Sequence, residues 1–164
     1  MKLSRTGTLS LFVSLSLLCS SLPVKAQMDG EVPRRSLRGI ETLDVLIEQL
    51  PESAQKLGLS KDSLQTDVEL KLRQNSITVT DVKDLKSQAT LYVLIDVIGT
   101  AASLSVSLGQ PVRLIRDQSV FALATTWEVR GIASNPSAKF IREHVADMVD
   151  QFLNAWLSVN PRTR

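Results

Sequence analysis

The 164-residue chain has a single cysteine, Cys19, and a single histidine, His144. One thiol cannot close an intramolecular disulfide, and one imidazole cannot form a site that needs two, as many zinc centres do. No Gly-x-Ser-x-Gly elbow supports a serine hydrolase, and the seven glycines are too scattered for a phosphate-binding loop. We therefore expect no catalytic site, no cofactor and no metal, with a hydrolase as a distant alternative.

A strong excess of one charge is also missing. The formal net charge is +2, but Lys2, Arg5 and Lys25 all precede residue 27, and without them 16 Lys and Arg stand against 17 Asp and Glu. Nucleic acids and anionic membranes attract proteins with a basic field. The near-neutral balance argues against both as the main partner.

The first 26 residues follow the order of an export signal. Lys2 and Arg5 provide a cationic start, residues 9–18 form an apolar run, and residues 24–26 (Val-Lys-Ala) fit a signal peptidase site. This pattern predicts that the segment is removed and that the mature protein begins at Gln27. Its expected location is the periplasm or the exterior of the cell.

Two alternatives remain open for this segment. The uncharged stretch 6–24 is nearly long enough for a retained membrane anchor, although several serines dilute it. Cys19 is a possible lipid attachment site, but the preceding Leu18 is larger than the small residue that a lipoprotein signal requires.

Residues 27–38 contain Gly30, Pro33 and several charges, and we predict an exposed flexible tether there. The remaining length is typical of one domain. We therefore expect a single domain over residues 39–161 and a short tail over 162–164.

Two elements are predicted at the start of the domain. Alternating apolar residues between Ile40 and Leu50 favour a strand that Pro51 ends, with a short amphipathic helix as the alternative. Ser60 can cap a helix with one apolar face, and Asn75 can end it in the left-handed conformation. The expected buried face consists of Leu64, Val68 and Leu72.

The middle of the domain is rich in β pattern. We expect a brief strand at 77–79, a surface connection over 80–88, and a central strand over 91–98 with both faces mostly covered. After a turn, a half-buried strand with outward-facing serines continues past Gly109 and Pro111, which indicate either a bulge or an edge position.

Asp117 and Gln118 form the expected hairpin turn into a last strand. Four apolar side chains of that strand are predicted to share one face: Phe121, Leu123, Trp127 and Val129. Asn135 and Pro136 then signal a long helix that runs to about Val159 and carries a broad apolar stripe. The stripe consists of Phe140, Ile141, Val145, Met148, Val149, Phe152, Leu153 and Trp156.

This order of elements predicts an α+β fold, a two-layer sandwich of a mainly antiparallel or mixed sheet with two helices on one face. The segments SLQTDVELKLRQNSI, ATTWEVRG and KFIREHVADMVDQFLNAWLSVNP resemble those of small exported bacterial proteins of uncharacterised function. The element order is similar to the TolB N-terminal type of periplasmic α/β domain. These resemblances imply an envelope setting and a role as an accessory or docking module, and they supply no catalytic motif.

Two groups of residues are candidates for contact with a partner. Arg34, Arg35 and Arg38 form a small basic cluster on the tether, suited to an acidic partner or to anionic lipid. Trp127 and Arg130 stand at a strand end that leads through a Gly-containing loop into a helix. Each group also has a purely structural interpretation: a solvated linker in the first case, and a core tryptophan with a solvated arginine in the second.

His144 lies beside the apolar stripe and is expected to be a surface or boundary residue, not a catalytic base. The sequence as a whole favours an exported, non-enzymatic interaction module whose partner is another envelope protein. The alternative is a small-molecule or lipid-binding protein with a cavity between sheet and helices.

We predict that the exported protein has the mass of a chain that starts at Gln27, because residues 1–26 have the features of a signal peptidase substrate. Mass spectrometry of the intact protein recovered from the cell envelope measures this. An acylated chain that starts at Cys19 would identify a lipoprotein instead, and a membrane-bound chain that retains Met1 would identify an anchor.

Overall fold

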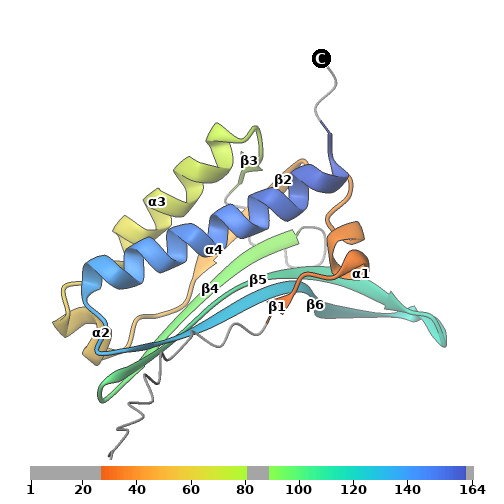
Figure 1. The fold of residues 1–164 in the computed structure, drawn as a ribbon. Coiled ribbons are helices and arrows are strands. Elements are labelled where there is room, and N and C mark those ends of the chain that lie inside the picture. Colours follow the sequence, from red (N-terminus) through yellow and green to blue (C-terminus); the bar gives the residue numbers. More distant parts are fainter. Residues whose placement is uncertain (1–26, 81–88, 162–164) are drawn as a thin grey trace, which may run out of the picture.

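A computed structural model describes residues 27–80 and 89–161 of the chain (Figure 1). The predicted export signal over 1–26, the tail over 162–164 and nearly all of the predicted 80–88 connection lie outside the described residues. The strands are β1 (Gln27–Met28), β2 (Thr42–Ile47), β3 (Thr78–Val79), β4 (Ala89–Ile98), β5 (Ala101–Leu114) and β6 (Asp117–Ser134). The helices are α1 (Glu31–Arg35), α2 (Glu52–Lys56), α3 (Lys61–Gln74) and α4 (Ala138–Val159).

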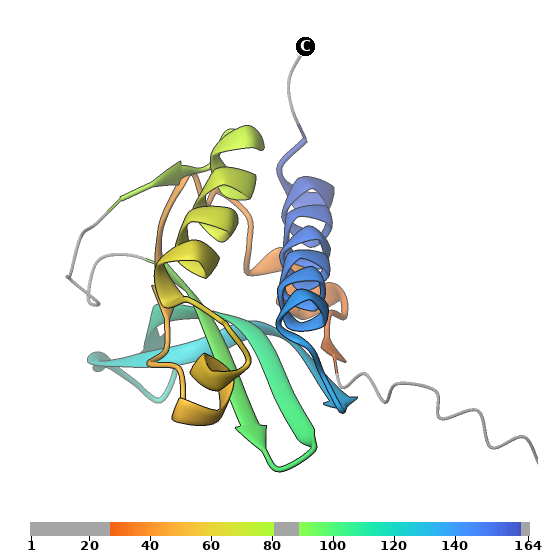
Figure 2. The same ribbon diagram turned by 90° about the vertical axis from the view of Figure 1, so that its left-hand side faces the viewer.

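The strands form one mixed sheet in the order β1-β6-β5-β4-β2-β3. β4, β5 and β6 are an antiparallel meander, whereas β2 pairs in parallel with both β4 and β3. The two long helices, α3 and α4, lie side by side on one face of this sheet (Figure 2). The predicted α+β sandwich is confirmed, and the strand interpretation of the segment between Ile40 and Leu50 is correct.

α3 begins where its cap predicts. The Ser63 amide donates to the Ser60 hydroxyl at 3.4 Å, and the expected apolar face is buried. The helix ends at Asn75 as predicted, but Asn75 is not left-handed: its φ is −99°, and the left-handed conformation belongs to the next residue, Ser76, at +67°. Leu70 lies off the buried face and is 53% exposed.

α4 begins later than predicted. Asn135 is left-handed, with a φ of +48°, and belongs to the turn that follows β6. The cap is Ser137, whose hydroxyl accepts from the Phe140 amide at 3.1 Å. The predicted Gly-containing loop directly after Arg130 is absent, because β6 continues through Gly131 to Ser134.

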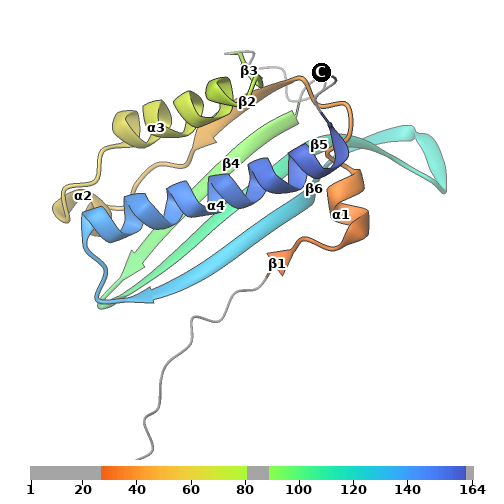
Figure 3. The same ribbon diagram turned by 45° about the horizontal axis from the view of Figure 1, so that its top comes forward.

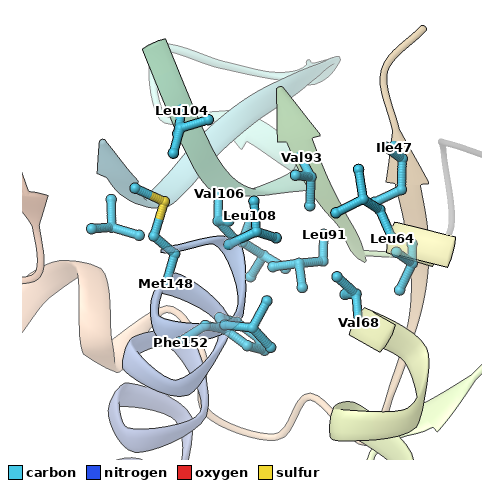
Figure 4. Close-up of a cluster of buried hydrophobic side chains, with 14 of the residues drawn as sticks. Ile47, Leu64, Val68, Leu91, Val93, Leu104, Val106, Leu108, Met148 and Phe152 are labelled. Carbon is cyan, nitrogen blue, oxygen red and sulfur yellow. The ribbon is translucent and has the colours of Figure 1, made fainter. Parts of the chain in front are cut away.

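The core lies between the sheet and the two helices (Figure 4). Phe152 and Trp127 are fully buried and meet edge to face, with ring centroids 5.4 Å apart. Gly131 allows α4 to approach β6 closely, since a Cβ at that position would lie 2.8 Å from the Met148 methyl carbon. The apolar stripe of α4 is confirmed, with Phe140 at its partly buried margin.

β4 is covered on one face only, contrary to the prediction of a strand covered on both. Leu91, Val93 and Ile95 are buried beneath the helices, but Leu94 is 39% exposed and Ile98 is 74% exposed. Both helices pack on the same side, so the apolar side chains of alternate residues face solvent. The face opposite α3 and α4 is called the free face below.

A β-bulge reverses the expected side-chain pattern of β6. Leu108 pairs with Trp127 and Gly109 pairs with Thr125, which leaves Thr126 as the extra residue. Phe121 and Leu123 therefore do not share the buried face of Trp127 and Val129. They are 57% and 54% exposed. Of the two alternatives predicted near Gly109 and Pro111, the bulge is confirmed, but its extra residue lies on β6, where the sequence predicted none.

The N-terminal segment is part of the fold and not a tether. β1 pairs with β6 at the sheet edge, and Leu37 has no exposed surface. The Asn160 side chain donates to the Leu37 carbonyl and accepts from the Gly39 amide, which fixes this segment to the end of α4. The domain therefore includes residues 27–38.

We predict that Phe152→Ala lowers the free energy of unfolding by about 3 to 5 kcal/mol, because it empties a fully buried ring site against Trp127. The matched control is Asn154→Ala, an exposed position on the same helix, with an expected effect within about 0.5 kcal/mol. Urea melts of both variants measure the difference. Two equal and small effects would mean that α4 packs through another face.

Candidate interaction surface

The hairpin formed by β5 and β6 extends beyond the body of the domain (Figures 1 and 3). β4 pairs with β5 only as far as Gly109, and β1 pairs with β6 only at Glu128 and Val129. Residues 110–124 thus make their strand pairings with each other. We call this two-stranded segment the arm. An isolated two-stranded ribbon is marginally stable in water. Beyond the pairings with β4 and β1, the outer edges of the arm have no strand partner among the described residues, so they are available to another chain.

The arm exposes large apolar side chains. Their exposed fractions are 97% for Ile115, 41% for Val120, 57% for Phe121 and 54% for Leu123. Single exposed apolar residues are ordinary on protein surfaces, but a group of them on one projecting element is typical of a contact site.

Polar contacts hold the tip of the arm. The turn lies at Ile115 and Arg116, two residues before the predicted turn, and Asp117 follows it in the sequence. The Ser119 amide and hydroxyl donate to the Asp117 carboxylate at 3.0 and 2.6 Å, which lowers the pKa of Asp117. Nearby, the Arg113 guanidinium lies 3.9 Å from the centre of the Phe121 ring.

A row of small side chains, which we call the trough, follows the free face of β5 in line with the arm. Ser103, Ser105 and Ser107 form its floor, and their paired neighbours on β4 and β6 have larger side chains. The flanking residues are Tyr92, Leu94 and Asp96 on β4, and Glu128, Arg130 and Ile132 on β6. Among them, Ile132 is 66% exposed and Leu94 is 39% exposed. The predicted serine row thus lies on the free face between larger polar and apolar side chains, but it does not face water throughout, because Ser107 is only 8% exposed.

The arm and the trough meet at a shallow hollow of about 270 Å³. It is lined by Leu46, Thr90, Tyr92, Ser107, Gly109, Leu123, Ala124 and Thr125. The Tyr92 hydroxyl donates to the Glu48 carboxylate beside it. Leu123 therefore extends the apolar surface of the sheet into the arm without a break.

The structure buries Trp127, the first residue of one predicted interaction pair. Its side chain lies in the core, and its indole nitrogen donates to the Asp29 carboxylate at 3.1 Å. Asp29 also accepts two hydrogen bonds from Arg34, at 2.9 and 2.6 Å, and these bonds raise the pKa of Arg34. Trp127 and Arg34 thus belong to a contact that fastens the N-terminal segment to β6.

The other predicted arginines do not gather at one site. Arg130 is exposed on the trough flank and pairs with Glu128 at 2.8 Å, which raises the pKa of Arg130. Arg35 lies on α1, 4.0 Å from Glu31, and Arg38 is exposed after that helix. The basic cluster of the sequence is therefore divided between an internal contact and the solvated surface.

His144 is a boundary residue whose ring stacks on Phe140, with centroids 3.9 Å apart. Within residues 27–80 and 89–161, no group of three or more acidic, histidine or cysteine side chains is placed to hold a metal ion. None of the helices in the same ranges is both long and apolar enough to cross a membrane.

The helix layer is closed where a ligand cavity was the alternative. The space between α3 and α4 next to Leu64 and Val145 measures about 10 Å³. Two ion pairs join the helices over it, Lys71 with Asp150 and Arg142 with Asp67, each at 2.6 Å. A volume of this size holds at most one water molecule.

No protein-family model matches the chain, and no curated protein matches it either. Seven chains of solved structures match, among them a PelC variant from Paraburkholderia phytofirmans that was solved as a dodecamer. The two chains are 11% identical, with a TM-score of 0.42 over 82% of this chain and 97% of the PelC chain. At this level the likeness concerns the course of the backbone alone.

We predict that Asp29→Ala lowers the free energy of unfolding by about 1 to 3 kcal/mol, because it leaves the buried Trp127 indole nitrogen without this acceptor. Glu31→Ala is the control, since the Glu31 side chain is 85% exposed in its pairing with Arg35. Denaturant melts followed by tryptophan fluorescence measure both. An Asp29 variant as stable as the control would show that this contact does not fasten the segment.

Proposed function

We propose that the protein is an exported, non-enzymatic interaction module of the bacterial cell envelope. The observation that carries this proposal is the continuous apolar surface from the arm, through Leu123, to Tyr92 and Leu46 on the free face. The surface is open and elongated, which suits a protein partner better than a small molecule. The sequence pattern of residues 1–26, which predicts an export signal, supports the envelope setting.

A small-molecule or lipid carrier is the weaker candidate. Such proteins enclose most of the ligand surface in a pocket of several hundred Å³. The space between α3 and α4 is about 10 Å³, and the hollows of about 270 to 510 Å³ elsewhere on the described residues are open to solvent. A strand or hairpin from another protein fits this surface without needing enclosure.

Within residues 27–80 and 89–161, the contact recorded for the single histidine is a ring stack and not a pairing with an acidic side chain. His144 stacks on Phe140 at the margin of the core, and Glu143 next to it in sequence points its charge toward Lys139, 3.7 Å away. A general base needs a partner that orients it and a substrate within hydrogen-bond reach. This arrangement favours binding over chemistry as the activity of the protein.

Affinity capture of the exported protein from envelope extracts, with mass spectrometry of proteins and lipids, tests the proposal. We expect one envelope protein to be captured, and expect Phe121→Ser combined with Leu123→Ser to reduce its recovery at least about tenfold, because apolar side chains at the centre of a contact dominate affinity. Leu70→Ser is the matched control, an exposed leucine on α3 in the other layer of the fold. The melting temperatures of all variants should stay close to that of the wild type.

The His144→Ala variant tests whether the protein has a histidine-dependent activity instead. We expect it to keep both capture and the ability to complement a deletion strain. If this variant is well folded but fails to complement, while the Phe121 and Leu123 double variant complements, the protein has a histidine-dependent activity and the proposed function is wrong.

A further inference from the structure

The bulge that sets the two faces of the arm is connected to the N-terminal segment. α1 lies where the arm leaves the body of the domain (Figures 1 and 3). The Gln110 side chain donates to the Thr126 hydroxyl at 2.6 Å and to the Ser36 carbonyl at 3.1 Å. Ser36 directly follows α1, and Thr126 is the extra residue of the bulge. One side chain at the root of the arm thus bridges the bulge and the N-terminal segment.

A regular ladder without the bulge is a second way to pair the two strands of the arm. In it Thr126 would pair with Gly109, and each later pairing partner on β5 would move by one position. Leu123, which pairs with Pro111 in the structure, would lie opposite Val112. A shift of one residue also turns every β6 side chain of the arm to the other face. We call this arrangement the slipped register.

The slipped register has favourable apolar pairs of its own. Leu123 would face Val112 and Phe121 would face Leu114, on the side of the sheet that the helices cover. Apolar cross-strand pairs of this kind stabilise a sheet. The structure instead pairs Phe121 with a charged residue, Arg113. The pairing of apolar side chains therefore favours the slipped register, and other contacts must favour the bulge.

We infer that Gln110 is a positioning residue, which holds the bulge and so keeps the apolar side chains of the arm on the free face. Gln110 lies on the helix side of the sheet, in regular alternation with Leu108. In the slipped register Thr126 would alternate regularly with Trp127 and point to the free face, away from Gln110. The hydrogen bond between Gln110 and Thr126 therefore belongs to the bulged register alone. This inference rests on the proposed function, because it concerns the regulation of the same surface.

The N-terminal segment supplies a fixed acceptor for the other end of this bridge. Leu37, next to Ser36, has no exposed surface, and the Asn160 side chain donates to the Leu37 carbonyl at 2.9 Å. On the other side of α1, Asp29 accepts from the indole nitrogen of Trp127, the residue that follows the bulge. The Ser36 carbonyl is thus part of the body of the domain and does not move with the arm when the strands slip.

Methyl nuclear Overhauser measurements on the exported protein test the inference. Gln110→Met keeps the length of the side chain but removes both donated hydrogen bonds. We expect it to raise the ratio of the Leu123–Val112 cross-peak to the Leu123–Leu46 cross-peak at least about fivefold, because the bridge stabilises one register only. Gln110→Ala should act in the same way. Recovery of the envelope partner in affinity capture should fall with the bulged population.

Two further variants are the controls. Gln118→Ala removes an exposed side chain at the tip of the same arm and should leave the cross-peaks unchanged. Deletion of Thr126 removes the extra residue itself, so that a regular ladder then preserves the observed pairs on both sides of it. In this deletion background, Gln110→Met should leave the ratio of cross-peaks unchanged. A general loss of stability would act in both backgrounds, whereas control of the register acts only where the bulge exists.

The inference is wrong if Gln110→Met and Gln110→Ala both keep the cross-peaks of the wild type, or if the ratio rises equally in the deletion background. Either result leaves the proposed function intact, because capture with the Phe121 and Leu123 double variant tests that separately. A slipped Gln110 variant that recovers the envelope protein at the wild-type level supports the control of the register and contradicts the surface assigned to the partner.

Discussion

The β-bulge at Thr126 determines which surfaces this protein presents. One extra residue in β6 shifts the pairing between Leu108 and Gly109, so side chains on the two sides of the bulge point to opposite faces of the sheet. On one side, Trp127 fills the core against Phe152. On the other side, Leu123 lies on the free face and is exposed to solvent. Without the bulge, the apolar residues of the arm would continue the buried row of the core.

The two faces of the sheet consequently have different roles. The helix-covered face is closed by α3 and α4, by the close approach of Met148 to Gly131, and by ion pairs between the helices. Its edge is sealed by β1 and by the contact of Asp29 with Trp127. The free face remains uncovered, with apolar side chains set between polar ones. A stable body thus supports an open surface, which is the arrangement that a docking protein requires.

Much of the fold could be predicted from local signals. The cap at Ser60, the spacing of Leu64 and Val68, and the broad stripe of α4 each act within one element, so the sequence pattern is sufficient to identify them. The bulge near Gly109 was also predictable, because glycine and proline rarely occur together inside a regular strand. The predictions that proved wrong concern how one element packs against another.

Three such relations depend on contacts that a sequence pattern does not contain. Gly109 and Pro111 predict irregular pairing on β5. The extra residue of the bulge lies on β6, however, and it turns Phe121 away from the helix-covered face. Apolar residues on both faces of β4 suggest complete burial, yet both long helices pack on one side. The charged segment 27–38 has the composition of a linker, and only the distant partners Trp127 and Asn160 fix it to the domain.

The site was predictable only in part. The serine row was found from its alternation, but Arg34 and Trp127 belong to an internal contact, and the arm was not identified. The sequence favours a turn at Asp117 and Gln118, whereas the structure turns at Ile115 and Arg116, which are poor turn formers compared with Asn-Gly or Asp-Gly. That conflict between local preference and structure is a common sign of a functional element.

The central claim is that the bulge turns Leu123 to the free face. Nuclear Overhauser measurements on methyl-labelled protein test it most directly, because Leu123 lines the same hollow as Leu46 and Tyr92. The account predicts cross-peaks between the Leu123 methyl groups and the side chains of Leu46 or Tyr92. Cross-peaks from Leu123 to side chains of α4, with none to Leu46 or Tyr92, would contradict it.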